Sequence, residues 1–171
     1  MPDTVRILGI DPGSRITGFG IVDATGPDCR FVHAGAIRCT DKDFNDRLRH
    51  IHASVRELIA EWSPDEMSVE QVFVSQNAGS ALKLGAARSA AICASFDTSL
   101  VIAEYAPRAI KLAVTGTGGA DKRQVQHMMK AILGLRENLQ ADAADALAVA
   151  MCHANSRRLA SQVAKSMVAR R

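Results

Sequence analysis

The chain has 171 residues, of which 47% are hydrophobic and 23% are charged, and its formal net charge is +3. These values are typical of one globular domain that is long enough to bury a core. They argue against a membrane span or a secretion signal, because the apolar runs are short and no basic segment precedes an apolar one at the N-terminus, so we expect a cytoplasmic protein.

The first informative stretch covers residues 5–22 and reads VRILGIDPGSRITGFGIV. Its apolar run predicts a strand over residues 5–10 that ends at Asp11. Pro and Gly at positions 12 and 13 favour a turn, and residues 17–22 predict a returning strand. The resulting hairpin would hold the Asp11 carboxylate at the edge of a hydrophobic sheet. Taken alone, this stretch is equally compatible with Asp11 as an ordinary turn residue.

A third strand is expected over residues 29–39, where alternation places Phe31, His33, Gly35 and Ile37 on one face. It completes an antiparallel meander. Residues 43–62 follow with apolar side chains at helical spacing, which predicts a long amphipathic helix. A short fourth strand, residues 67–72, then carries Glu70 among apolar neighbours.

The second half alternates between helices and one strand. Residues 77–96 predict a helix rich in Ala and Gly, which suits close approach either to its own sheet or to a second subunit. A fifth strand, residues 99–105, would lie parallel to the fourth because a helix joins them. Helices are then expected from Pro107, from Asp121 and from Ala141. The pattern predicts an α/β fold with one mixed sheet flanked by helices.

Four carboxylates could meet in this fold. Asp142 and Asp145 are three residues apart and project from one helix face, although they could simply complement the helix dipole. Glu70 could likewise point to water. If the strands of Asp11 and Glu70 are neighbours and the last helix packs beside them, all four converge and require cations. Oxygen ligands suit Mg²⁺ or Mn²⁺ in a two-metal site, where one ion activates water and the other stabilises the leaving oxygen.

Three sequence blocks, GIDPGSRITGFGIV, VEQVF followed by N-x-x-SALKLGAAR, and QADAADALAVA, stand in an order and spacing that resemble the RuvC family of Holliday-junction resolvases. The resemblance implies an RNase H-like fold, with a mixed five-stranded sheet of three antiparallel and then two parallel strands. It implies that Asp11, Glu70, Asp142 and Asp145 are catalytic ligands of two Mg²⁺ ions, for which Mn²⁺ can substitute. It further implies a homodimer that nicks four-way DNA junctions symmetrically, leaves 5′-phosphate and 3′-hydroxyl ends, and cooperates with the RuvA–RuvB complex.

The same resemblance assigns DNA-contacting residues. Phe73 is similar to an aromatic residue that stacks on an exposed base, although core packing is the alternative. Lys111 and Lys122 correspond to basic residues near the scissile phosphate and are included among the catalytic residues. Lys83, Arg88 and Arg123 are further candidates for phosphate contacts. Many relatives have a lysine where this chain has Ser75-Gln76, which puts a phosphate contact near Phe73 in doubt.

Other functions remain open at this point: another RNase H-like nuclease with a different nucleic-acid substrate, or a non-catalytic junction-binding protein. An actin-like kinase, suggested by GIDPGS, would need a second subdomain that 171 residues scarcely hold. We expect a single nuclease domain over residues 1–155. Residues 156–171 would form a basic C-terminal tail, with five basic residues and no acidic one, that either contacts nucleic acid or is a disordered end.

Overall fold

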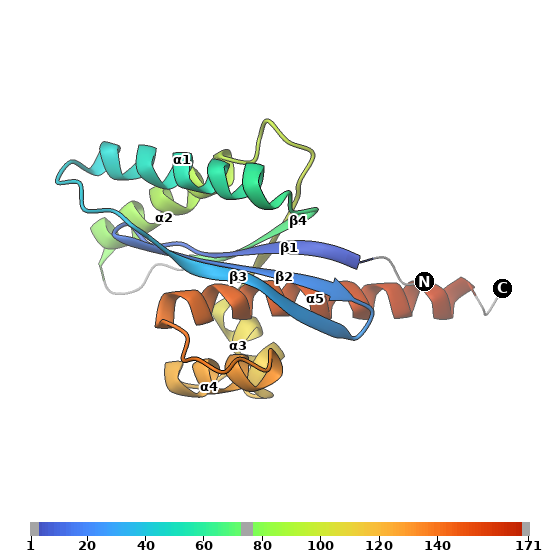
Figure 1. Cartoon of the computed structure of the whole chain (residues 1–171). Coiled ribbons are helices and arrows are strands. Elements are labelled where there is room, and N and C mark those ends of the chain that lie inside the picture. The colour runs from blue at the N-terminus through green and yellow to red at the C-terminus, as the bar shows by residue number, and fades with distance from the viewer. Residues whose placement is uncertain (1–3, 73–76, 169–171) are drawn as a thin grey trace.

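A mixed five-stranded sheet lies between two layers of helices in the computed structural model, which describes residues 4–72 and 77–168 (Figure 1). The strand order is β3-β2-β1-β4-β5. The strands are β1 (Thr4–Asp11), β2 (Ile16–Thr25), β3 (Asp28–Arg38), β4 (Glu66–Glu70) and β5 (Val101–Tyr105). The helices are α1 (Phe44–Trp62), α2 (Ala78–Cys93), α3 (Pro107–Thr115), α4 (Lys122–Ile132) and α5 (Ala141–Val168). The α/β fold predicted from the sequence is confirmed, including its three antiparallel and two parallel strands.

The strand pairing brings the predicted carboxylates to one end of the sheet. β1 pairs antiparallel with β2 and parallel with β4, and the register places Ile10 beside Val69. Asp11 and Glu70 each come one residue later, at the carboxyl ends of these two neighbouring strands. The adjacency expected from the sequence is therefore confirmed.

Strand β3 departs from the predicted alternation. The register shifts between Ile21 and Val22, which pair with His33 and Phe31 and leave Val32 without its own partner. A bulge of this kind puts two successive side chains on one face. Val32 and Ile37 accordingly pack in the core beneath α1 and α2, whereas Phe31 packs in the core beneath α5. The expectation that Phe31 shares a face with His33 and Ile37 was wrong for this reason.

Helix α5 lies unusually close to the sheet because glycines face it. A Cβ added at Gly9 would meet the backbone carbonyl of Ala146, and one added at Gly18 would meet the carbonyl of Asp142. At Gly20 the nearest atoms of Leu147 would be 2.7 Å away. The helix backbone therefore rests almost directly on β1 and β2, which fixes the distance between the sheet and the carboxylates of α5.

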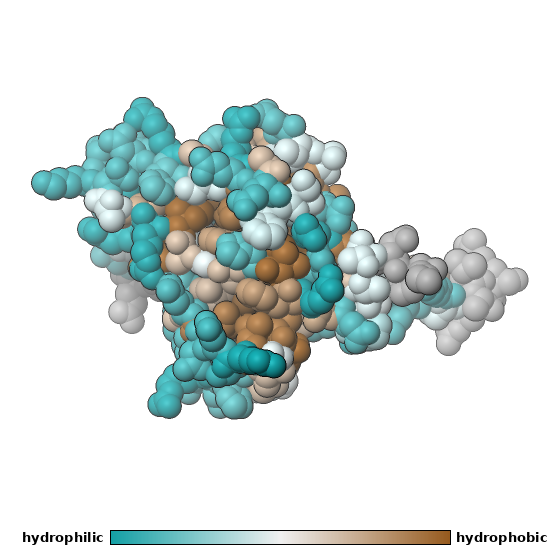
Figure 2. All heavy atoms as spheres, in the orientation of Figure 1, coloured by the Kyte–Doolittle hydropathy of each residue, from teal (hydrophilic) through white to brown (hydrophobic). Residues whose placement is uncertain are grey.

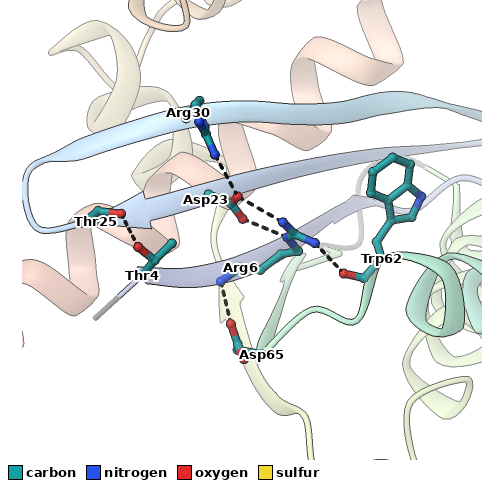
Figure 3. A network of polar contacts seen from close by, with 7 residues as sticks. All are labelled: Thr4, Arg6, Asp23, Thr25, Arg30, Trp62 and Asp65. Atoms are coloured by element: carbon teal, nitrogen blue, oxygen red, sulfur yellow. Dashed lines mark hydrogen bonds and ion pairs between the residues drawn. The ribbon is translucent and has the colours of Figure 1, made fainter. Parts of the chain in front are cut away.

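At the end of the sheet away from Asp11, a polar network connects the start of β1 and the end of β2 to the C-terminal end of α1 (Figure 3). Nε of Arg6 donates to Oδ1 of Asp23 at 2.8 Å, and its second guanidinium contact reaches Oδ2 at 3.1 Å. The same guanidinium donates to the carbonyl of Trp62 at 2.9 Å. The backbone N–H of Arg6 donates to Asp65 at 2.7 Å. This bidentate ion pair stabilises the β1–β2 pair at the end of the sheet remote from Asp11.

The expected basic tail is a continuation of α5. The helix runs without interruption to Val168, and its exposed end projects beyond the body of the protein (Figure 1). Residues 156–168 contain neither Gly nor Pro and include good helix formers, so nothing in them ends the helix.

Figure 2 shows where hydrophobic residues gather on one face of the molecule. They lie between the helix layer that contains α1 and the layer that contains α4, and the outer surfaces of both layers are mostly hydrophilic.

Candidate active site

The turn after β1 fixes the position of Asp11. Thr17, which is fully buried, donates from its hydroxyl to the carbonyl of Gly13 at 2.8 Å. The same hydroxyl accepts from the N–H of Gly13 at 3.2 Å. These bonds close the Pro12-Gly13 turn and hold Asp11 opposite Gly18, its partner on β2. Because Gly18 has no side chain, the backbone of Asp142 on α5 can approach the same point.

The first turn of α5 brings in the carboxylates of the third element. Asp142 and Asp145 lie near the N-terminus of α5, which is the end of the helix closest to Asp11 and Glu70. The Asp145 side chain is 18% exposed and pairs with Nζ of Lys122 at 3.2 Å. Asp145 is therefore buried against the cavity beside a cation, and Asp142 lies one turn earlier on the helix.

Two lysines approach from α3 and α4. Lys111 lies in the middle of α3, and Lys122 is the first residue of α4. A capping box begins α4: the Asp121 carboxylate accepts from the N–H of Gln124 at 2.9 Å, and the Gln124 amide oxygen accepts from the N–H of Asp121 at 2.8 Å. The cap fixes where the helix begins and therefore where Lys122 emerges.

A cavity of about 230 Å³ joins these groups. Three acidic residues, two lysines and four apolar residues line it: Asp11, Glu70, Asp145, Lys111, Lys122, Pro107, Ile110, Val125 and Ala148. The apolar walls of this cavity were not predicted from the sequence. Their signal was weak, since Ile110 and Val125 look like ordinary positions on the buried faces of their helices.

Burial and mutual repulsion dominate the electrostatics. The pKa of Asp11 is raised from 3.8 to about 8, first by burial, then by its hydrogen bond with Glu70 and by the negative charges of Glu70 and Asp145, while Lys122 opposes the rise. The pKa of Asp145 is raised by burial against the opposing effect of Lys122. The pKa of Lys122 is raised, chiefly by Asp145. At neutral pH, Asp11 therefore favours a proton or another positive charge beside it.

The donor set fits a hard divalent cation. All of its ligating atoms are carboxylate oxygens, which Mg²⁺ and Mn²⁺ prefer, and the raised pKa of Asp11 marks a place where positive charge is favourable. Over residues 4–72 and 77–168, however, no three His, Cys, Asp or Glu side chains are already gathered tightly enough to hold one ion. Asp142 is also absent from the described lining of the cavity.

The remaining predicted DNA contacts are placed differently. Arg88 forms an ion pair with Glu104 of β5 and lines a separate cavity of about 540 Å³, so its guanidinium is already engaged. Lys83 is exposed on α2. Arg123 lines a third cavity, which shares no lining residue with the cavity that Asp145 lines. Phe73, like Ser75-Gln76, lies outside the described residues. All of these DNA contacts stay predictions.

This sheet order, with acidic residues on the first and fourth strands and on the last helix, defines the RNase H-like class. Comparison with known proteins narrows the class. Residues 7–153 match the family model described as "Crossover junction endodeoxyribonuclease RuvC". The chain belongs to this RuvC family.

Individual relatives agree with that assignment. The crossover junction endodeoxyribonuclease RuvC of Aliivibrio fischeri is 52% identical over 166 residues, which cover 96% of each chain. The Vibrio campbellii protein of the same name is 55% identical over 150 residues, covering 88% of this chain and 87% of its own. Among solved structures, Thermus thermophilus RuvC in complex with a Holliday junction substrate is 33% identical, with a TM-score of 0.85. The match covers 91% of this chain and 96% of that one.

Proposed function

We propose that this chain is a structure-selective endonuclease that resolves four-way DNA (Holliday) junctions by paired symmetric nicks. Membership of the RuvC family supports the proposal, as does the likeness to a Thermus thermophilus protein that was solved with a Holliday junction substrate. The observation that carries it is the single cavity in which Asp11, Glu70 and Asp145 meet two lysines. Such a site combines the ligands of a divalent ion with cations suited to a phosphate.

Asp11, Glu70, Asp142 and Asp145 would hold two Mg²⁺ ions, with Mn²⁺ as a substitute. When bound, the ions would supply a hydroxide-like nucleophile and stabilise the leaving oxygen of an in-line displacement, which leaves 5′-phosphate and 3′-hydroxyl ends. The protein itself contributes carboxylates that are held by three different elements. Since Asp11 ionises reluctantly without a positive charge nearby, ion binding at neutral pH would displace a proton from this group.

Lys111 and Lys122 would bind the phosphate that is cut. Lys122 stands at the N-terminus of α4, where backbone N–H groups and the helix dipole also favour an anion. It lies 3.2 Å from Asp145, so the same lysine can hold that carboxylate and attract DNA to it. The apolar walls formed by Pro107, Ile110 and Val125 limit water around the phosphate.

The proposal extends to assembly and partners. A homodimer would match the approximate twofold symmetry of a four-way junction. The small-residue helix α2, with Leu82 75% exposed, offers a surface for this contact. Phe73 would stack on a base at the crossover, and Lys83, Arg88 and Arg123 would contact phosphates. We also propose cooperation with the RuvA–RuvB complex and a cytoplasmic location; the described helices include none that is long and apolar enough to cross a membrane.

The direct test compares a labelled synthetic four-way junction with plain duplex of the same sequence, with and without Mg²⁺. We expect Mg²⁺-dependent nicks at symmetric positions of the junction, and 5′-phosphates at the cut ends. Asp11→Asn should bind the junction and fail to cut it, whereas the exposed Asp28→Asn should behave as wild type. Equal cutting of duplex would favour another RNase H-like nuclease. Junction binding without any cutting would indicate a non-catalytic binding protein.

A further inference from the structure

A second polar network lies near the middle of α5, eight residues beyond Asp145. His153 is 5% exposed, and its Nε2 is 2.5 Å from Oε2 of Glu66 on β4. Its Nδ1 is 2.7 Å from the hydroxyl of Tyr105 on β5. Nε of Arg157, one turn further along α5, lies 2.8 Å from the same Glu66 oxygen. The network thus joins α5 to both parallel strands.

The hydrogen-bonding capacity of His153 is fully used in this arrangement. With the imidazole proton on Nε2, His153 donates to Glu66, and the Tyr105 hydroxyl donates to Nδ1. Glu66 also accepts from Arg157, so its largely buried carboxylate faces two donors. A slide of α5 along the sheet would separate these partners and leave a buried carboxylate unpaired, which is costly.

The same two elements carry the proposed metal ligands. Glu66 and Glu70 are four residues apart on β4, a span of about 13 Å at the usual strand rise. Asp145 and His153 are eight residues apart on α5, a span of about 12 Å at the usual helical rise. The Glu66–His153 contact therefore lies at about the same distance along the strand and along the helix from the cavity that Glu70 and Asp145 both line, so it determines how the helix lies lengthwise against the strand.

The part of α5 that crosses Gly9 and Gly18 sets this position less sharply. It presents Ala146 and Ala150 to these glycines, which control how closely the helix approaches, while larger side chains such as Leu147 and Val149 pack in the core beside them. Small apolar surfaces present few protrusions that interlock, so they resist a lengthwise shift weakly. A polar contact with defined geometry supplies the missing constraint.

We propose that Glu66, His153 and Tyr105 are positioning residues, which set the lengthwise position of α5 on β4 and thereby align Asp145 with Glu70 and Asp11. The inference rests on the proposed function, since it assumes that these carboxylates act together. Among the described residues that line the active-site cavity, none belongs to this network, so its effect on activity is transmitted through α5 and β4. Arg157 strengthens the contact from the first part of the basic segment.

The test compares His153→Leu, and the double variant Glu66→Leu/His153→Leu that leaves no buried carboxylate unpaired, with Val149→Ala. Val149 is fully buried on the same helix, so its truncation removes core volume and leaves the network intact. We expect both network variants to raise the Mg²⁺ concentration for half-maximal cleavage about tenfold or more and to lower kcat, as loss of outer-shell support does elsewhere. Junction binding in Ca²⁺ should stay within about twofold of wild type.

Two further variants separate positioning from stability. Tyr105→Phe removes one hydroxyl and should raise the Mg²⁺ concentration for half-maximal cleavage by less than His153→Leu does. His153→Gln, whose amide can still donate to Glu66, should restore part of the loss. A readout independent of cleavage is the rise in Tm on adding Mg²⁺, which should be large in wild type, small in His153→Leu and retained in Val149→Ala.

The positioning role is refuted if His153→Leu and the double variant keep the Mg²⁺ requirement of Val149→Ala at temperatures where all are folded. That result is distinct from failure of the proposed function. If wild type itself shows neither Mg²⁺-dependent cleavage nor an Mg²⁺-dependent Tm shift that requires Asp11, the metal site is refuted, whatever the network variants do.

Discussion

Asp11→Asn should stabilise the metal-free protein while abolishing its activity. In the fold, the pKa of Asp11 is raised from 3.8 to about 8, so the native state holds a proton that the unfolded chain releases near pH 4. Between these values the unfolded state binds fewer protons, and stability falls as pH rises. An asparagine is uncharged at every pH, nearly the same size as aspartate, and can donate a hydrogen bond to Glu70. It therefore removes the loss of stability that the buried Asp11 carboxyl group causes as pH rises.

The size of the effect follows from the shift. At pH 7, 3.2 pH units separate the solution from the unfolded pKa, which sets an upper limit of about 4 kcal/mol. The site can relax around Asp11, so we expect a gain of about 1.5–2 kcal/mol in the free energy of unfolding. For a chain of this length this corresponds to a rise in Tm of about 3–8 °C. At pH 5 the same calculation gives a stabilisation by Asp11→Asn that is about a third of its value at pH 7.

The assay is thermal unfolding of wild type and Asp11→Asn in EDTA at several pH values from 5 to 8, with the exposed Asp28→Asn as the control. The gap between Asp11→Asn and wild type should widen as pH rises, and the control should show no such trend. Added Mg²⁺ should raise the Tm of wild type and of Asp28→Asn but not that of Asp11→Asn; at ten times its Kd an ion stabilises by about 1.4 kcal/mol. A lower Tm for Asp11→Asn at pH 8 in EDTA, or a gap independent of pH, would refute this reasoning.

Three other substitutions test separate parts of the structure. Gly9→Ala pushes a methyl group into the backbone of α5 and should lower the free energy of unfolding by about 1–3 kcal/mol, measured by urea titration; an unchanged midpoint would contradict the close approach of helix and sheet. Asp23→Asn removes the bidentate ion pair between β1 and β2 and should lower the free energy of unfolding, measured in the same way, by about 1.5–3 kcal/mol. The pKa of Asp23 is lowered by that pair, so the cost should be present at neutral pH and vanish as pH falls below 4; a deficit that persists in acid would count against the ion pair. Lys122→Met should reduce kcat at least tenfold, with Lys122→Arg retaining more activity, in single-turnover cleavage assays; equal rates for wild type and Lys122→Met would remove this lysine from the proposed site.

The sequence predicted most of the architecture because its local signals agree with the fold. Apolar runs ended by Pro and Gly marked the β1–β2 hairpin, and the helix between the fourth and fifth strands required them to be parallel. These signals put Asp11 and Glu70 at the ends of two strands, and the structure shows that the two strands are neighbours. The meeting of Asp11, Glu70 and Asp145 in one cavity then needed only that α5 pack on the same end of the sheet.

What sequence reasoning missed depends on contacts between distant residues. The bulge that turns Phe31 to the other face of β3 has no Gly or Pro signal at that position. Arg88 resembled a free cation until the fold placed Glu104 opposite it. Glu66 and His153 are 87 residues apart, and nothing local links them. Side-chain pairing across a sheet or between layers follows from tertiary packing, which periodicity does not encode.

The central claim is that carboxylates from β1, β4 and α5 together hold divalent ions. Anomalous diffraction at the manganese absorption edge, from crystals soaked in Mn²⁺, tests it most directly. We expect peaks in the cavity within about 2.2 Å of carboxylate oxygens of Asp11 and Glu70 and of at least one of Asp142 and Asp145, and we expect their loss in Asp11→Asn. Manganese bound only outside this cavity, at concentrations that support cleavage, would contradict the claim.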